Sequence, residues 1–165
     1  MLFTDEVNNM EELIDKLAEY DDLGKIKVAV VCFIFDKQDH LILHRRGPGA
    51  RDEIGKLQAI GGSVNRTDEN FRASLQRELA EEAGTNCSIR IDDFIGAQLD
   101  GKVDKHTGNY VNWIILAYKG KVTSGELENM EPDRCVGFER EYINDFKRED
   151  LSDTAYNFIQ KMLSE

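Results

Sequence analysis

The amino-acid sequence predicts an α/β (α+β) protein in which a mixed β-sheet lies between helices. One observation is the run Lys25–Asp36, which is apolar on both alternations, as is typical of a central strand covered on both faces. Another is that helical periodicity occurs in three segments, set before, between and after strand-like runs. Strands with helices between and after them are typical of a sheet packed against helices on both sides.

Local patterns place the individual elements. Apolar residues at helical spacing predict a helix over residues 9–21 that ends near Gly24. A second helix is expected over residues 70–83, and a third follows Ser152, whose hydroxyl can cap it. A polar loop is expected over residues 100–109. The expected strands cover residues 25–36, 41–46, 87–99, 110–122 and 135–143, with a short strand near the end of the glycine-rich loop 47–62.

Composition limits the kinds of partner. The 165 residues carry a formal net charge of −11, which disfavours nucleic acid or an anionic membrane as the main partner because both bind clustered cations. A small phosphorylated ligand stays compatible, since a bound metal or a few arginines can reverse the field inside a cleft. The acidic N-terminus lacks the apolar run of a signal peptide or membrane span. Three cysteines without metal-ligand spacing, Cys32, Cys87 and Cys135, predict buried thiols in a reducing cytoplasm.

Three glutamates crowd one side of the helix expected over residues 70–83. With Glu78 at zero on the helical wheel, Glu82 falls at about 40° and Glu81 at about −60°. The apolar stripe of the same helix covers about 20° to 140°, so the acidic face overlaps the border of the buried face. Carboxylates at the edge of a core repel one another and lose hydration, and at least one should titrate above its ordinary pKa.

Two interpretations compete with a metal site. The acidic face could be solvated, but its helical phase opposes this, and Arg72 and Arg77 could neutralise the glutamates, but two arginines do not obviously reach three acids. A divalent cation is therefore favoured. Oxygen ligands without His or thiolate suit Mg²⁺ (or Mn²⁺) better than zinc, and Mg²⁺ bridges phosphate oxygens, so a di- or triphosphate is the expected substrate class.

The same segment carries a family resemblance. It reads Gly62, six residues, Glu69, seven residues, then Arg77-Glu78-Leu79-x-Glu81-Glu82-x-Gly84. This resembles the signature of the Nudix hydrolases: Gly, five residues, Glu, seven residues, Arg-Glu-apolar-x-Glu-Glu-x-Gly-apolar. The sequence departs from it by one extra residue before Glu69, by Thr85 after the last glycine and by Ile60 where many members have proline.

The resemblance implies a fold, a reaction and roles. It implies a Nudix-type α/β/α sandwich, with one domain over residues 1–165 and a helical extension over residues 1–25. It implies Glu81 and Glu82 as metal ligands and Glu78 as a further ligand or the base. The backbone of Gly61-Gly62 would supply a carbonyl ligand. Arg77 is expected to anchor the helix by pairing with Glu69, and Gly84 to end it.

Residues outside the signature have two interpretations each. Glu131, in a loop before a strand, matches the distal acidic ligand of some nucleoside-triphosphate-cleaving members, or it is an exposed loop residue. Candidate phosphate-binding residues, each with a surface role as the alternative, are Arg45, Arg46 and Arg51. Candidate base-stacking residues, each with a core or hairpin position as the alternative, are Tyr110, Trp113 and Phe138. No role is expected for His40, His44 or His106.

The expected activity is metal-dependent hydrolysis of a phosphoanhydride in a small nucleotide-type substrate. The motif Asn129–Cys135 favours nucleoside triphosphates, cleaved to a monophosphate and pyrophosphate. Arg46, Arg51 and Gly55 partly match the pattern of coenzyme A pyrophosphatases, so coenzyme A, ADP-ribose and nucleotide sugars stay as alternatives. A non-catalytic nucleotide sensor and a prenyl diphosphate isomerase are alternatives of another class, but Cys87 and Cys135 are not obviously placed to be the catalytic cysteine of such an isomerase. A homodimer is one assembly that the sequence allows.

Overall fold

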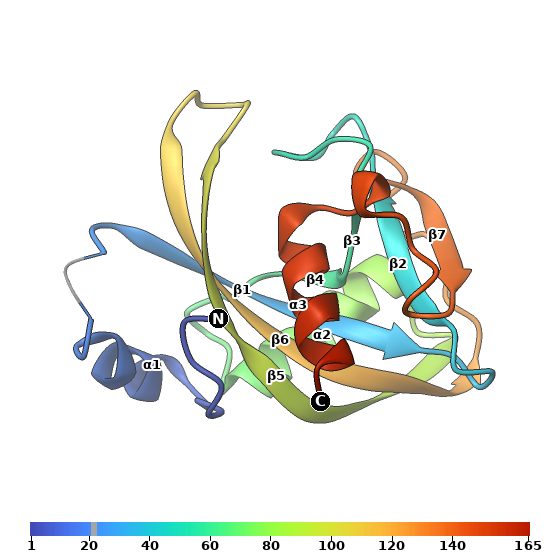
Figure 1. Ribbon diagram of the computed structural model, residues 1–165, viewed down its shortest axis with the longest axis horizontal. Coiled ribbons are helices and arrows are strands. Elements are labelled where there is room, and N and C mark those ends of the chain that lie inside the picture. The colour runs from blue at the N-terminus through green and yellow to red at the C-terminus, as the bar shows by residue number, and fades with distance from the viewer. Residues whose placement is uncertain (21–22) are drawn as a thin grey trace.

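The computed structural model of the protein describes residues 1–20 and 23–165 (Figure 1). Within these ranges it has the helices α1 (Met10–Leu17), α2 (Phe71–Ala83) and α3 (Asp153–Leu163), with a short 3₁₀ helix η1 (Arg148–Asp150). The strands are β1 (Ile26–Phe35), β2 (Leu41–Arg46), β3 (Leu57–Gln58), β4 (Ile60–Ser63), β5 (Cys87–Val103), β6 (Tyr110–Gly125) and β7 (Cys135–Glu141). Of the described helices, none is long and apolar enough to cross a membrane.

The strands form one mixed sheet in the order β3-β2-β1-β6-β5, with β4 also paired to β1 and β7 to β2. β1 and β6 run parallel over the whole of β1, and the other named pairs are antiparallel. The β1 side chains from Val30 to Ile34 are all buried, which confirms that this doubly apolar strand is central.

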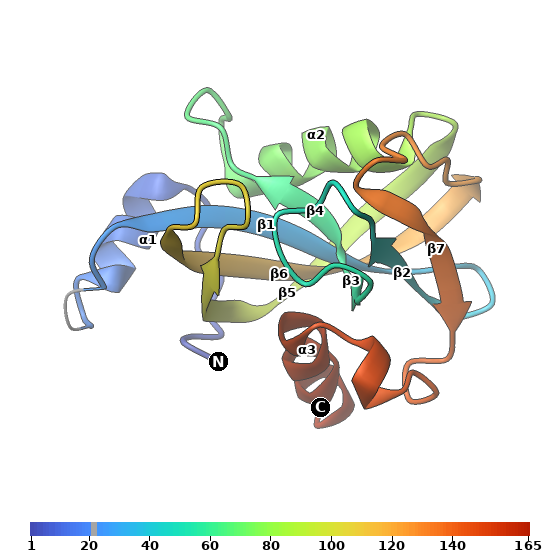
Figure 2. The ribbon, with the colours of Figure 1, turned by 90° about the horizontal axis from the view of Figure 1, so that it is seen from above.

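Helices cover both faces of the sheet, as Figure 2 shows for α2 and α3. Phe71, Leu75 and Leu79 of α2 lie in one apolar cluster with alternate residues of β1 and β6. Phe158 and Ile159 of α3 lie in the second cluster, on the opposite face. The α/β/α sandwich is therefore confirmed.

Several predicted boundaries differ from the structure, the N-terminal helix and the loop 100–109 by the most residues. The N-terminal helix ends at Leu17, because the amides of Glu19 and Tyr20 bond carbonyls three residues back, in a tighter turn. The end of its predicted range, residue 21, lies outside the described residues. The predicted loop 100–109 is shorter, because strand pairing continues to Val103 opposite Tyr110. Polar composition concealed this, since a hairpin of mainly polar residues has no apolar alternation.

The predicted cap of α3 gives a test of the fold away from the cleft. The Ser152 hydroxyl accepts a hydrogen bond from the Ala155 amide at 3.0 Å and is buried. Ser152→Ala should lower the free energy of unfolding by about 1 kcal/mol, because it removes the partner of a helix N-terminal amide. Urea unfolding measures this. Ser124→Ala, at an exposed position on β6, is the control, and equal stability of the two variants would contradict the cap.

Candidate active site

The site is built where the C-terminal half of α2 lies against β4. α2 begins at the cap Asn70, whose side chain accepts from the Ala73 amide, and ends at Gly84, which has a positive φ of 81°. Glu78 is buried at 8% exposure and its carboxylate lies over Gly62. A Cβ at Gly62 would come within 2.3 Å of Glu78 Oε2, so only glycine allows this approach.

Glu82 contacts the preceding residue of β4, Gly61. Its Oε2 accepts a hydrogen bond from the Gly61 amide at 2.9 Å. Burial raises the pKa of Glu82 to about 8, and the neighbouring carboxylates of Glu78 and Glu131 also raise it. Burial likewise raises the pKa of Glu78. The expectation that at least one glutamate titrates above its ordinary range is confirmed.

Arg77 holds the acidic side chains in place. Its Nη1 donates to Glu78 at 2.9 Å and to Glu81 at 3.3 Å, and its Nη2 donates to the Ser63 carbonyl at 3.0 Å. Arg77 therefore reaches two of the three glutamates, whereas Arg72 pairs with Glu6. Arg77 therefore donates hydrogen bonds to Glu78 and Glu81, whereas Glu82 accepts a hydrogen bond from the Gly61 backbone amide.

The expected pairing of Arg77 with Glu69 is wrong. Arg77 binds Asp68 instead, at 3.0 Å, and this hydrogen bond lowers the pKa of Asp68 to about 2. Asp68 also accepts from the Ser74 hydroxyl at 2.7 Å, whereas Glu69 is exposed. Asp68 follows Gly62 after the usual five residues, so the extra residue lies after the acid and not before it. A count forward from Gly62 would have found Asp68.

The glutamates face a cleft of about 310 Å³. Its lining includes Glu78, Glu81, Glu82 and Glu131, together with Gly62. The structure therefore brings the distant Glu131 to the signature glutamates, as the metal-ligand interpretation of this loop residue requires. The backbone supports this arrangement, because the Met130 amide bonds the Glu82 carbonyl at the end of α2.

The three arginines expected to bind phosphate separate into two groups. Arg46 and Arg51 line the cleft. Arg45 instead pairs with Glu139 at 2.6 Å and donates to the Gly55 carbonyl. It lies next to Arg46 on β2, and neighbouring residues of a strand point to opposite faces, so both could not face one cleft.

The aromatic residues considered for base stacking also lie in different parts of the structure. Trp113 lines the cleft, half-buried, with the Lys27 ammonium 5.6 Å from its ring centroid. Tyr110 is 67% exposed on the hairpin, and Phe138 packs at the margin of the α2-side core. Cleft residues that sequence reasoning missed are Asp52, Glu53, Gln58, Asp100, Lys102 and Arg134. They come from segments far apart in the chain and carry no shared spacing.

The donor set fits a hard divalent cation. Glu78, Glu81, Glu82 and Glu131 line the same cleft and offer carboxylate oxygens, and burial, followed by the neighbouring carboxylates, raises the pKa of Glu82. Among the described residues, no group of three or more His, Cys, Asp or Glu side chains is placed so that it could hold a metal ion as it stands. The Glu81 side chain, 52% exposed, has the rotamer freedom to turn toward the others.

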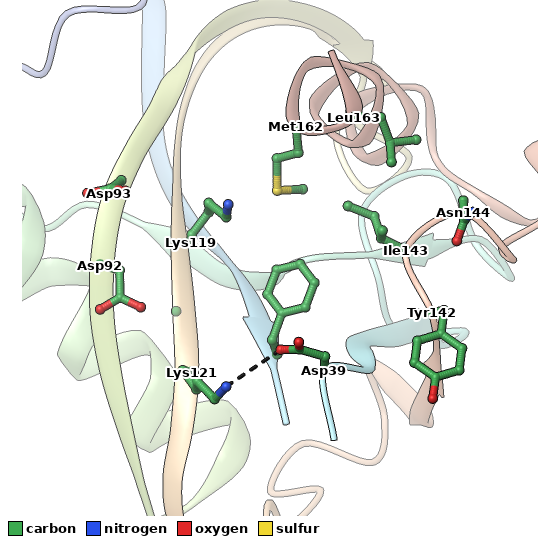
Figure 3. A pocket seen from close by; sticks show the side chains of 12 residues that line it. Asp39, Asp92, Asp93, Lys119, Lys121, Tyr142, Ile143, Asn144, Met162 and Leu163 are labelled. Atoms are coloured by element: carbon green, nitrogen blue, oxygen red, sulfur yellow. Dashed lines mark ion pairs between the residues drawn. The ribbon is translucent and has the colours of Figure 1, made fainter. Parts of the chain in front are cut away.

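A larger cleft, of about 750 Å³, lies elsewhere (Figure 3). β5, β6 and the end of α3 contribute to it, and Lys121 pairs across it with Asp39 at 3.5 Å. Its described lining includes none of the predicted site residues. The larger cleft is therefore not the candidate active site, because the signature glutamates line the smaller one.

Sequence comparison places the chain in a family. Residues 25–162 match the profile of the NUDIX domain. The chain therefore belongs to the Nudix family and is a Nudix pyrophosphohydrolase, of a family that generally uses divalent metal ions. No curated protein matches the chain by sequence.

Solved structures share the fold at low identity. The MutT NUDIX hydrolase from Burkholderia pseudomallei is 21% identical with a TM-score of 0.64, over 84% of this chain and 98% of that one. The MutT protein from Methanosarcina mazei Go1 is 19% identical with a TM-score of 0.69, over 87% and 97%. The NUDIX domain of Shewanella oneidensis NrtR, solved with ADP ribose, is 15% identical with a TM-score of 0.65, over 92% and 96%.

The raised pKa of Glu82 predicts a pH-dependent stability of the metal-free protein. Between the ordinary glutamate pKa of 4.5 and about 8, the folded state binds more protons at this group than the unfolded state. Stability in EDTA should therefore fall as pH rises through that window, by on the order of a few kcal/mol. Glu82→Gln keeps an acceptor for the Gly61 amide but removes the charge.

Thermal unfolding in EDTA from pH 5 to pH 8 measures the effect. The Glu82→Gln variant should be at least as stable as the parent at pH 8 and should lose most of the slope. Glu141→Gln, at an exposed position on β7, should keep the parental slope. Clear destabilisation by Glu82→Gln across the range would show that this glutamate is a structural partner and not part of a cation site.

Proposed function

We propose that this protein is a divalent-metal-dependent hydrolase that cleaves a phosphoanhydride bond of a nucleoside diphosphate linked to another group. The proposed preferred substrate is a nucleoside triphosphate, cleaved to a monophosphate and pyrophosphate. The observation that carries the proposal is that Glu78, Glu81, Glu82 and Glu131 line one cleft. Family membership supports the reaction class.

The proposed cofactor is Mg²⁺ (or Mn²⁺), held by these four carboxylates and the carbonyl of Gly62. When bound, Mg²⁺ neutralises phosphate charge and lowers the pKa of a water molecule. Ligands of this type are hard oxygens, which is the set that Mg²⁺ and Mn²⁺ prefer.

The chain's own residues orient the reactants. Arg77 fixes the carboxylate of Glu78 and contacts the exposed carboxylate of Glu81, and the Gly61 amide fixes Glu82. Arg46 and Arg51 lie on the same cleft and would bind the phosphate oxygens. A carboxylate of the cluster takes the proton of the attacking water, which must approach in line with the leaving phosphate.

Substrate preference rests on Glu131. Its loop matches the distal acidic ligand of triphosphate-cleaving Nudix hydrolases, and its presence on the cleft supports that assignment. Coenzyme A, ADP-ribose and nucleotide sugars are the alternative substrates. The NrtR domain, solved with ADP ribose, illustrates a nucleotide-type ligand on the same fold.

The alternatives of another class have less support. A non-catalytic sensor does not need the complete set of signature glutamates that this chain keeps. For the isomerase alternative, Cys135 lines a small cavity beside Glu82 and Glu131, but burial raises the pKa of its thiol and so disfavours the reactive thiolate.

We also propose that residues 1–165 act as one Nudix domain with a helical extension over residues 1–25. Support comes from Phe3, Val7 and Leu13, which are buried in the α2-side core. A cytoplasmic location is proposed as well, which the three free thiols support.

Metal removal and substrate comparison test the function. Turnover should require Mg²⁺ or Mn²⁺ and should stop in excess EDTA. In side-by-side assays, nucleoside triphosphates should give a higher kcat/KM than ADP-ribose, coenzyme A, nucleotide sugars or isopentenyl diphosphate. Undiminished turnover in EDTA would refute the metal-dependent mechanism, and a higher kcat/KM on ADP-ribose or coenzyme A would reassign the substrate.

Glu131 gives a separate test of the ligand set. Glu131→Gln should raise the Mg²⁺ concentration needed for half-maximal turnover by about tenfold or more, because one charged ligand is lost. Mn²⁺ binding followed by electron paramagnetic resonance should weaken in parallel. Glu141→Gln is the matched control. Parental kinetics of Glu131→Gln at limiting Mg²⁺ would make this residue an ordinary loop glutamate.

A further inference from the structure

Arg134 is a cleft residue to which sequence reasoning assigned no role. It follows Glu131 by three positions and lines the cleft together with Glu82. Its side chain is 65% exposed, and its Nη1 lies 3.9 Å from Glu131 Oε2, at the outer limit of an ion pair. The guanidinium therefore lies beside the carboxylate cluster with most of its donor capacity open to the cleft.

The other arginines near the cleft differ in how firmly they are held. Arg46 pairs with the Asp52 carboxylate at 3.0 Å and also donates to the Asp52 carbonyl at 2.8 Å. Arg77 is held by the hydrogen bonds described above. Arg51 has only a 4.0 Å ion pair with Asp104. Within the described ranges, Arg51 and Arg134 are thus the cleft arginines with the weakest protein contacts.

A backbone connection holds these two arginines on one rim. The Gly47 amide donates to the Arg134 carbonyl at 2.7 Å, and the Gly49 amide donates to the Asp133 carbonyl at 2.8 Å. A Cβ at Gly47 or Gly49 would lie 2.9 or 2.8 Å from the Asp133 carbonyl oxygen, so the approach depends on glycine. The loop that carries Arg51 is therefore fixed to the loop that carries Glu131 and Arg134.

We propose that Arg134 and Arg51 form a pair that binds the phosphates of the substrate beside the carboxylate cluster. The inference rests on the proposed function and adds a specific anion-binding residue to it. In the free protein the Arg134 guanidinium offsets the charge of Glu131. A polyphosphate offers it a stronger, bidentate partner, because phosphate oxygens match the guanidinium fork.

Calorimetric binding of the α,β-methylene analogue of a nucleoside triphosphate, whose bridge resists hydrolysis, tests the proposal with Mg²⁺ present. Arg134→Gln should weaken binding by about tenfold or more, the loss expected for one hydrogen bond to a charged group. KM should rise by a similar factor with little change in kcat, and Arg134→Lys should recover part of the loss.

Two comparisons make the result specific. Arg90→Gln removes an exposed arginine with one carboxylate partner away from the cleft and should bind like the parent. In a Glu131→Gln background, Arg134→Gln should still weaken binding, because its partner is the phosphate. If the loss disappears in that background, Arg134 only neutralises Glu131 and the proposal is overturned.

Parental binding by Arg134→Gln would also overturn it. Because binding is measured without turnover, a parent that binds the analogue but hydrolyses none of the candidate substrates would refute the proposed function separately.

Discussion

The close approach of α2 to β4 is the constraint on which the rest of the site depends. Gly61 and Gly62 lack side chains, and so the carboxylates of Glu78 and Glu82 can lie directly against the strand. A Cβ at Gly61 would also come within 2.0 Å of the Val30 carbonyl oxygen, so the same residue is needed for pairing with the central strand. One pair of glycines therefore serves both the sheet and the acidic cluster.

Charge balance around that contact explains why the cluster is tolerated without a cation. Arg77 bridges Asp68, Glu78 and Glu81, and this network fixes the start of the acidic face. Glu82 receives only a backbone amide and stays largely protonated near neutral pH, since burial disfavours its charged form. A protonated carboxyl at this position avoids an uncompensated buried charge in the metal-free protein.

Sequence reasoning was most successful where one helix carried the signal. The phase of Glu78 and Glu82 on α2 follows from periodicity, as does the buried central strand, because both depend on local spacing. Asp68 was missed because the extra residue before α2 was placed ahead of the acid, whereas the structure places it after the acid. Arg134 and Lys102 were missed, and Arg45 was misplaced, because segments distant in the chain build the cleft and only tertiary packing decides which side chains face it.

The parallel pairing of β1 with β6 also affects how the protein folds. Paired residues of these two strands are about half of the chain apart, so their contacts are highly non-local, and β4 pairs with the same central strand. Such topologies fold slowly, because the entropy of closing a long loop is lost before the contacts form. The helix α2, which carries the glutamates, is a local structure. Its packing surface on β4 is complete only when β4 is paired with β1. Assembly of the acidic cluster therefore depends on the pairing of β4 with the central strand.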